Sequence, residues 1–537
     1  MSRIAALAAA ALLLHLVLIQ PNHPDAMAWN ALFLFPLELP VMLLALIALP
    51  AGARLTQGLR LLLVAVLMVI ALAKLADYGT FIAFNRGFNA VVDYNLIHAA
   101  WVLGSGSIGT PLAALAVAGA LLALALVAWA LWWATGRWAR LRPPPALALV
   151  AGLALVPATG LAVGEIGQAM RAWSMPFQAP GAAFTARVGI ERVALWRETL
   201  SDLRDFRRAA TEDPYVGRQG LLSALDGRDV QLIYVESYGR SSFENPLYRP
   251  THAGTLRAAE PQLAAAGLGM RSGWLTAPMV GGQSWLAHGS VASGLWTDNQ
   301  GRYRAMIASP RRTLFHFAAQ AGYRTAAVMP AITMAWPEAG FFGFDAIHAA
   351  ADLGYRGLPF NWVTMPDQFT LSAFDRLERE VADRPPLFAQ IALISSHAPW
   401  VPVPDLVPWD AVGDGTVFNA MAQAGDPPDV VWRDHDRVRE QYRLAIDYTL
   451  RTVTDYAARV ANDAPLMIVL GDHQAARFVS GTQDFDVPIH VIGPPELVER
   501  FAAWGFAEGL IPDPSTPALR MDAFRDRFLE TFTDGES

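Results

Sequence analysis

The sequence predicts a multi-pass α-helical membrane domain followed by an α/β domain whose mostly parallel central sheet is covered by helices. Two observations predict this fold class. The 537-residue chain is 53% hydrophobic and only 17% charged, which is too apolar for an ordinary soluble protein, and the apolar excess lies in its first third. From residue 220 on, short apolar runs alternate with helical patterns, which is typical of a helix-covered parallel sheet.

Five apolar stretches in the first third are long enough, or nearly so, to cross a hydrocarbon core of about 30 Å. Arginines gather in the segments around residues 51–58 and 136–144, so the positive-inside rule places the N-terminus in the cytoplasm. With five spans, everything after them lies on the outer side of the membrane. The predicted spans lie near residues 4–20, 29–50, 59–77, 111–134 and 145–164.

The chain is therefore expected to have three parts. Residues 1–165 form a transmembrane domain of five helices, residues 166–215 an amphipathic membrane-proximal linker, and residues 216–537 the α/β domain. A signal peptide with a cleavage site at residues 26–28 is an alternative. That site lies far from the apolar region, and the intervening segment 21–24 is typical of a loop, so a first span is the better interpretation.

The composition excludes several classes of function. The chain has no cysteine, which rules out disulfides, thiolate metal sites, a cysteine nucleophile and a formylglycine made from cysteine. Its formal net charge of −7 argues against a nucleic-acid partner. The membrane segments carry almost no acidic residues away from their ends, which disfavours a coupled transporter.

Six apolar runs of the α/β domain predict strands. Four of them are followed by residues that could bind a metal ion or take part in a reaction. Because carboxyl ends of parallel strands meet at one edge of a sheet, those residues are expected to converge there. We expect helices at 309–321, 367–382, 434–461 and 521–532. The predicted strands are Val230–Val235, Trp274–Ala277, Arg324–Met329, Leu387–Ile394, Leu466–Leu470 and Val487–Ile492.

Carboxylates and an imidazole at these strand ends indicate a site for one divalent cation. Glu236 follows the first strand, and Asp472 and His473 follow the Leu466–Leu470 run and a glycine. Carboxylate oxygens and imidazole nitrogens are common ligands of such ions. Ser284 follows two glycines at an apparent helix start. Serine there is ordinarily a helix cap, and it becomes a nucleophile only if its pKa is lowered, as a metal on its Oγ would do.

Two further histidines are candidates for substrate contact. His397 follows the strand that ends at Ile394, where it could donate a proton to a phosphoryl oxygen or a leaving group. His288 comes four residues after Ser284, so a helix would place both on one face. A single histidine is more often structural, and His490, inside a predicted strand, is interpreted as a core residue or as a residue that supports the site from behind its ligands.

Taken together, these motifs resemble the phosphoglycerol-transferase branch of the alkaline phosphatase–sulfatase superfamily, which includes lipoteichoic acid synthase. The resemblance implies a sulfatase-like fold and one metal ion, Mn²⁺ or Mg²⁺ with Zn²⁺ as the alternative, bound by Glu236, Ser284, Asp472 and His473. It also implies that Ser284 is the nucleophile. The motifs that carry it are Val235-Glu236-Ser237, Gly281-Gly282-Gln283-Ser284, Ser395-Ser396-His397-Ala398-Pro399, Gly471-Asp472-His473, Gly322-Tyr323-Arg324-Thr325 and Gly343-Phe344-Asp345.

The substrate pocket departs from the family pattern at one position. By similarity, His397 binds substrate and Trp336 lines a glycerol-phosphate pocket. Two residues after Trp336, lipoteichoic acid synthases carry an arginine on the phosphate, whereas this chain has Pro337 and Glu338. A carboxylate in place of a bidentate cation should weaken binding of that anion. Either Glu338 points away, or it contacts a head group with a positive charge, such as phosphoethanolamine.

The function implied by the resemblance is transfer of phosphoglycerol or phosphoethanolamine from a membrane phospholipid to an envelope glycan or glycolipid through a covalent intermediate on Ser284. The protein would lie in the bacterial inner (cytoplasmic) membrane with its catalytic domain in the periplasm or outside the cell. A membrane-anchored phosphodiesterase or sulfatase-like hydrolase is an alternative, although the Cys/Ser-x-Pro-x-Arg signature of sulfatases is absent around Ser284. A non-catalytic envelope binding protein is a third possibility.

Overall fold

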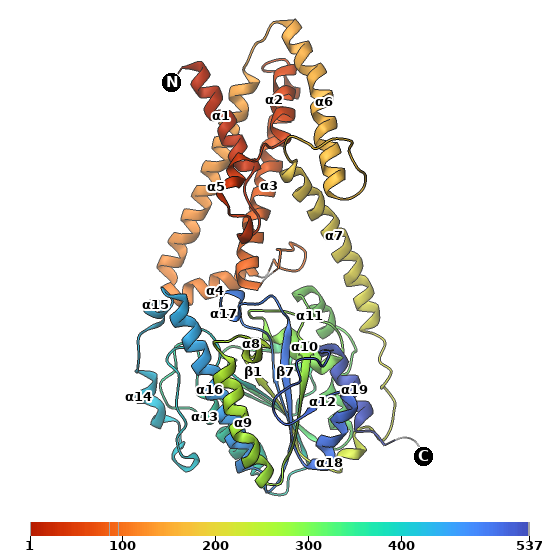
Figure 1. Ribbon diagram of the computed structural model, residues 1–537, viewed down its shortest axis with the longest axis vertical. Helices are drawn as coiled ribbons and strands as arrows, with labels where there is room; N and C mark the ends of the chain where they lie inside the picture. The colour runs from red at the N-terminus through yellow and green to blue at the C-terminus, as the bar shows by residue number, and fades with distance from the viewer. Residues whose placement is uncertain (1, 85, 95, 535–537) are drawn as a thin grey trace. The chain divides into compact units, whose positions relative to one another are not determined.

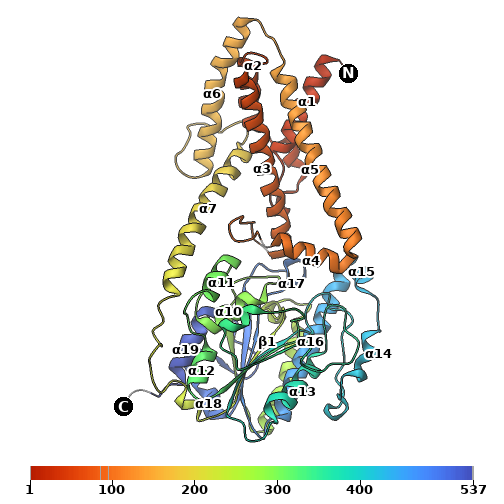
Figure 2. The same cartoon turned by 180° about the vertical axis from the view of Figure 1, so that it is seen from behind.

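The computed structural model describes residues 2–84, 86–94 and 96–534. The chain divides into two compact units, one formed by Met1–Ile82 with Arg86–Asp202 and the other by Ala83–Asn85 with Leu203–Ser537. Figures 1 and 2 show that the first unit is built of helices, whereas the second has a central sheet with helices on both faces. These two architectures confirm the predicted fold class.

Three helices of the first unit, α3, α5 and α6, are long and apolar enough to cross a membrane, as judged from length and composition. The first two predicted spans correspond to α1 and α2, which are shorter apolar helices. These helices indicate a membrane protein. The topology with five spans stays a prediction. The helices are α1 Arg3–Leu18, α2 Glu38–Ala48, α3 Arg54–Phe84, α4 Leu96–Ile108, α5 Thr110–Ala139, α6 Pro145–Ala169 and α7 Phe184–Ala209.

The sheet of the second unit has the strand order β4-β3-β5-β1-β6-β7-β2-β8, and β9 pairs with β2. β1 lies between β5 and β6 and runs parallel to both. β7 is antiparallel to β6 and β2, so the sheet is mixed but mostly parallel. The strands are β1 Val230–Val235, β2 Gly269–Thr276, β3 Arg324–Met329, β4 Ala346–Ala349, β5 Leu387–Leu393, β6 Leu466–Gly471, β7 Asp486–Gly493, β8 Ala507–Glu508 and β9 Leu519–Arg520.

Two hydrophobic cores lie on opposite faces of this sheet. Side chains of β1 alternate between them, with Ile233 and Val235 in one core and Leu232 and Tyr234 in the other. Every residue of β1 is buried, as expected for a strand covered on both faces. Helices α9 and α16 border the first core, and α10, α12 and α19 border the second. Each fully buried large apolar side chain contributes about 1.5–3 kcal/mol relative to exposure.

The helices agree with prediction where local signals are strong. The predicted helix 434–461 is α16, which starts after Asp434, whose carboxylate accepts from the N–H groups of Asp436 and Arg437. The predicted helix 309–321 is shorter, because Thr313 caps α12 at Leu314. The longer helices of the unit are α9 Arg249–Ala265, α10 Ser284–Ser293, α11 Gln300–Ile307, α12 Leu314–Gln320, α13 Asp367–Phe374, α16 His435–Arg459 and α19 Phe524–Thr531. The helices of four residues are α8 Ser241–Glu244, α14 Asn419–Ala422, α15 Pro428–Val431, α17 Arg477–Ser480 and α18 Pro495–Val498.

The strand directions bring several carboxyl ends to one edge of the sheet. β3, β5, β1 and β6 are parallel, and β2 points the same way because it is antiparallel to β7. In the register, Val235 of β1 lies opposite both Leu393 of β5 and Gly471 of β6. The residues that follow these three positions therefore lie beside one another, and they include Glu236 and Asp472.

Candidate active site

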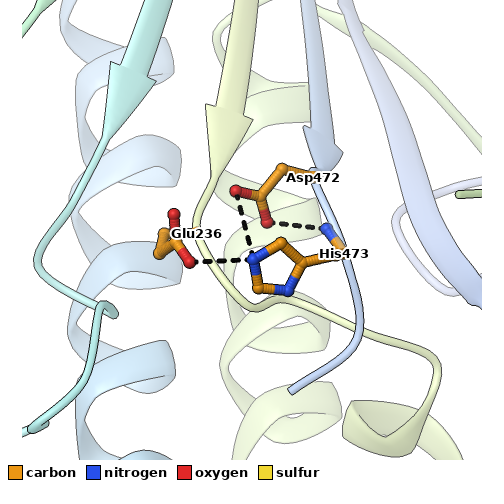
Figure 3. A group of neighbouring side chains, drawn as sticks. All are labelled: Glu236, Asp472 and His473. Carbon is orange, nitrogen blue, oxygen red and sulfur yellow. Dashed lines mark hydrogen bonds and ion pairs between the residues drawn. The ribbon is translucent and has the colours of Figure 1, made fainter. Parts of the chain in front are cut away.

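Glu236, Asp472 and His473 form a buried cluster at this edge (Figure 3). The Nε2 atom of His473 lies 3.0 Å from Oε1 of Glu236 and 3.9 Å from Oδ2 of Asp472. One ligand atom from each residue lies within 4.8 Å of the others. Within the described residues, His473 Nε2 has no hydrogen-bond partner of good geometry despite this proximity. Two carboxylates and a directed imidazole nitrogen fit a divalent cation.

Ser284 is the first residue of α10, and its half-buried hydroxyl donates to Oε2 of Glu236 at 3.0 Å. The preceding loop is fixed to the loop after β6: Val280 forms a parallel bridge with Gln474, and the N–H of Gly281 donates to the Gln474 carbonyl at 2.9 Å. Gln283 turns the chain into the helix with a φ of 68°, in the left-handed region. These contacts hold the serine beside the acid–histidine cluster.

Backbone donors fix the Asp472 carboxylate. Its Oδ1 accepts from the N–H groups of Ser237 at 2.8 Å and His473 at 2.7 Å. Ser237 makes its N–H available by adopting a φ of 60° directly after β1. Gly471 allows β6 to approach closely, because a Cβ at this position would overlap the carbonyl oxygen of Tyr238. The cluster therefore depends on a tight contact between two strand ends.

A further set of side chains supports the cluster from outside. The hydroxyl of Ser396 donates to the Glu236 carbonyl at 2.6 Å, and that of Tyr442, from α16, donates to the Ser237 carbonyl at 2.9 Å. Nδ1 of His473 lies 2.9 Å from the Gln474 carbonyl, to which it donates, so that Nε2 is the ring nitrogen directed at the carboxylates. Sequence reasoning missed Tyr442 and Gln474. Ser396 belongs to the His397 motif, and this membership is the only feature of the sequence that points to its role in the site.

The charges of the cluster are strongly coupled. Burial raises the pKa of Glu236, but the charges of His473 and His397, together with side-chain hydrogen bonds to His473 and Asp472, hold that pKa well below its ordinary value. Burial and the charge of Glu236 raise the pKa of Asp472 to about 8. Burial opposes the charge on His473, but Asp472 and Glu236 raise its pKa to about 9. A cation would relieve the repulsion of two crowded carboxylates.

The two other histidines flank this cluster. His397 lies on the loop after β5, with Nδ1 at 2.5 Å from the Ala398 carbonyl, and its charge contributes to the low pKa of Glu236. His288 lies one turn after Ser284 and packs on Tyr234, with ring centroids 4.0 Å apart. Burial lowers the pKa of His288 to about 4, so its ring is neutral. Its Nε2 and the Tyr234 hydroxyl lack hydrogen-bond partners among the described residues.

Trp336 and Glu338 lie together after β3, at the start of the short helix Pro337–Phe341. The Trp336 ring packs on Phe342 with centroids 5.8 Å apart. Burial and then the charge of Glu338 raise the pKa of Tyr303, which places this carboxylate near α11. In the described part of the chain, neither Trp336 nor Glu338 forms a hydrogen bond or ion pair with the cluster. Their substrate-binding roles stay predictions.

Comparisons with known proteins add similar structures. No family model and no curated protein matches the chain. The chain is similar to the crystal structure of the lipoteichoic acid synthase LtaP from Listeria monocytogenes, with 12% identity over 63% of this chain and 79% of that chain and a TM-score of 0.37. It is similar to the Streptococcus pyogenes phosphoglycerol transferase GacH in complex with sn-glycerol-1-phosphate (12% identity, 63% and 82%, TM-score 0.36). It also matches the C-terminal periplasmic domain of EptC from Escherichia coli in complex with Zn (13%, 57% and 82%, TM-score 0.36).

The matched structures include the kinds of protein that the motifs resemble. Identities of 12–13% and TM-scores of 0.36–0.37 are nevertheless too low to transfer a function to this chain. What the chain can do chemically follows from its own residues. A serine hydroxyl, two carboxylates and an imidazole meet at the sheet edge, with two more histidines beside them.

Proposed function

We propose that this chain is a metal-dependent phosphotransferase. It moves phosphoglycerol or phosphoethanolamine from a membrane phospholipid to an envelope glycan or glycolipid through a covalent intermediate on Ser284. The observation that carries the proposal is the Ser284 hydroxyl, 3.0 Å from Glu236 at the rim of a cluster suited to a cation. Helices long and apolar enough to cross a membrane would keep the chain at a lipid surface.

The residues that would hold the cation are Glu236, Ser284, Asp472 and His473. When bound, a divalent cation lowers the pKa of an adjacent hydroxyl and neutralises charge on phosphoryl oxygens. Oxygen-rich ligation with one imidazole suits Mn²⁺ or Mg²⁺, and Zn²⁺ accepts the same atoms. The position of His473 Nε2 supports this assignment: it is buried between carboxylate oxygens of Glu236 and Asp472 at 3.0 and 3.9 Å and makes no hydrogen bond of good geometry within the described residues.

In the first half-reaction, Ser284 Oγ attacks the head-group phosphorus in line. The Oγ–P bond forms as the P–O bond to diacylglycerol breaks, and the hydroxyl proton passes to solvent. His397 donates a proton to the departing diacylglycerol oxygen. Because its Nδ1 is engaged with the Ala398 carbonyl, Nε2 is the atom available for this transfer. The product is a phosphodiester on Ser284, with diacylglycerol left in the membrane.

In the second half-reaction, an acceptor hydroxyl attacks the same phosphorus and the Oγ–P bond breaks. His397 takes the proton from the attacking hydroxyl, and Ser284 recovers its own from solvent. A saccharide hydroxyl gives transfer, and water gives hydrolysis through the same intermediate. The hydrolase alternative thus differs only in the second half-reaction.

The proposal is tested by diacylglycerol release from labelled phosphatidylglycerol and phosphatidylethanolamine by the full-length protein in vesicles. We expect release that requires added Mn²⁺ or Mg²⁺ and is lost in Ser284→Ala. Release that is undiminished in Ser284→Ala would exclude the assigned nucleophile. Analysis of the water-soluble product with and without added glycan then separates transfer from hydrolysis.

A further inference from the structure

A long segment, residues 394–434, connects β5 to α16 and carries an exposed aromatic side chain, Trp432, which is hydrogen-bonded to the carbonyl of Pro399, two residues after His397. Trp432, at the end of α15, keeps 41% of its surface exposed, although tryptophan ordinarily gains stability from burial. It differs from a mobile surface side chain because three contacts hold it in place.

These contacts define an aromatic shelf formed by Trp400, Trp432 and Phe478. The indole of Trp432 stacks on buried Trp400, with centroids 5.8 Å apart and planes inclined by 6°. Its Nε1 donates to the Pro399 carbonyl at 3.2 Å, and Phe478 meets it edge-on at 5.9 Å. The shelf therefore presents a preorganised flat ring to solvent.

The shelf is tied to the reactive cluster through one short chain of contacts. Trp400 Nε1 donates to the Ser396 carbonyl at 2.7 Å, and the Ser396 hydroxyl donates to the Glu236 carbonyl at 2.6 Å. His397, the proposed proton donor and acceptor, lies between these anchoring residues in sequence. A molecule resting on Trp432 would thus be held by the same loop that carries His397.

The charged rim of the shelf indicates what binds there. Segment 426–439 carries four aspartates and three arginines, and three of the aspartates are in exposed or part-exposed ion pairs, Asp429–Arg433, Asp426–Arg437 and Asp436–Arg439. Exposed carboxylates accept hydrogen bonds from hydroxyls, and exposed guanidinium groups donate hydrogen bonds to them. An anionic lipid surface attracts basic segments, and this segment has no basic excess. A neutral polyhydroxylated ring needs no basic excess, and its C–H face suits the negative face of an indole.

We propose that the shelf around Trp432 binds the saccharide acceptor, with one sugar ring stacked on the indole and its hydroxyls bound by the rim. This inference rests on the proposed function, since it assigns the acceptor of the second half-reaction as a glycan. According to this inference, the shelf decides whether a glycan or water attacks in the second half-reaction, because a sugar hydroxyl bound near His397 competes with solvent. Trp432 is accordingly a specificity-determining residue that touches the acceptor.

The test measures saccharide binding and catalysis separately, using the full-length protein in phosphatidylcholine nanodiscs. The probes are linear hexasaccharides of glucose and of N-acetylglucosamine, with Kd determined by calorimetry and ring contact by saturation-transfer NMR. For the best-binding hexasaccharide, Trp432→Ala should raise Kd about five- to tenfold, while Trp432→Phe retains much of the affinity. Trp362→Ala, which removes a tryptophan that is 48% exposed, is the matched control and should leave Kd unchanged.

Activity distinguishes failure of this inference from failure of the proposed function. In Trp432→Ala, the ratio of diacylglycerol release with glycan to release without glycan should fall to about one, whatever the rate without glycan is. Equal hexasaccharide affinity in Trp432→Ala and wild type, or no binding of either probe to wild type, would overturn the inference even if lipid cleavage is intact. Quenching by brominated lipids that disappears in Trp432→Phe would also overturn it, because the bilayer would then occupy the shelf. Absence of lipid cleavage in wild type, with hexasaccharide binding retained, would instead contradict the proposed function.

Discussion

At the residue scale, the hydrogen bond of Ser284 decides how this serine can be activated. It is donated to the Glu236 carboxylate, whereas the nearest ligand imidazole, His473, turns its Nε2 towards the two acids. A Ser–His pair that removes the hydroxyl proton directly is therefore not the arrangement seen. The proposed activation by a cation is compatible with these atoms, since a bound cation lowers the pKa of an adjacent hydroxyl without a histidine on the serine.

Metal affinity should depend on pH because the ligands hold protons that a cation must displace. Asp472, with a pKa of about 8, and His473, with a pKa of about 9, both carry protons at pH 7. Binding of Mn²⁺ then releases protons, and the affinity should rise from pH 7 to pH 9 by up to about tenfold per proton and pH unit. Calorimetry of the metal-free, full-length protein in buffers of different ionisation enthalpy measures both quantities.

Two variants sharpen this pH prediction. Asp472→Asn removes a titrating ligand, so it should weaken Mn²⁺ binding and lower the number of protons released by about one. Asp513→Asn changes a carboxylate in a surface turn and should leave both values as in wild type. An affinity that stays constant or falls as the pH rises would contradict the proposed ligand set.

Glu338 should influence the choice of donor head group. If its carboxylate faces the head group, Glu338→Arg should raise kcat/KM for phosphatidylglycerol relative to phosphatidylethanolamine by about tenfold, because an anionic contact becomes a bidentate phosphate donor. Glu338→Gln, which removes the charge alone, should lie between the two. Competition between the two labelled lipids in one vesicle gives the ratio directly. An unchanged ratio in both variants would mean that Glu338 points away from the substrate.

The sequence predicts the reactive residues more readily than the residues that hold them in place. Glu236, Asp472 and His473 directly follow apolar strands, so chain direction alone predicts a common edge for them. Tyr442 lies in the middle of a long helix, and its contact with Ser237 depends on how α16 packs on the sheet. The position of His288 beneath Tyr234 likewise depends on tertiary packing, although its helical spacing from Ser284 was visible.

At the element scale, the approach of β6 to the turn after β1 is the contact on which the cluster depends. Gly471→Ala should push these strand ends apart, since its Cβ would overlap the Tyr238 carbonyl oxygen. We expect a loss of several kcal/mol in stability, of the order seen for overpacking a core, together with loss of stabilisation by Mn²⁺. Thermal unfolding of the full-length protein with and without Mn²⁺ measures both effects.

A second glycine provides the control for this prediction. Gly254 lies within α9 with open space around its missing side chain. Gly254→Ala should be neutral or stabilise by up to about 1 kcal/mol, as expected for a helix interior. A Gly471→Ala protein that unfolds like wild type and keeps its Mn²⁺ response would show that the strand ends tolerate separation.

The elements themselves were predictable to different degrees. All six predicted strands are present, because long buried runs such as Val230–Val235 admit few other structures. β4, β8 and β9 were missed, since strands of two to four residues leave no periodic signal. The predicted helix 367–382 is α-helical from Asp367 to Phe374 and continues as a π-helical turn over Asp375–Arg379. No sequence pattern predicted this turn.

At the scale of the whole molecule, the chain combines a helical unit with an α/β unit that carries the reactive cluster. Hydropathy alone separated these parts, because apolar helices and an alternating α/β pattern differ strongly in composition. Span number was harder to judge: α3, α5 and α6 meet the length and hydropathy expected of a crossing helix, whereas α1 and α2 are shorter. Orientation, as well as the linker at 166–215, stays a prediction from arginine placement and amphipathic pattern.

The central claim is that a lipid head group becomes covalently attached to Ser284. It is tested most directly by peptide mass spectrometry of the full-length protein, quenched after incubation with Mn²⁺ and mixed phospholipid vesicles in the absence of glycan. We predict a mass increase on the peptide containing Ser284 that matches a phosphoglycerol or phosphoethanolamine ester, absent from Ser284→Ala and removed when an acceptor glycan is added. Sustained release of diacylglycerol without any adduct at Ser284, or with the adduct on another residue, would contradict the account.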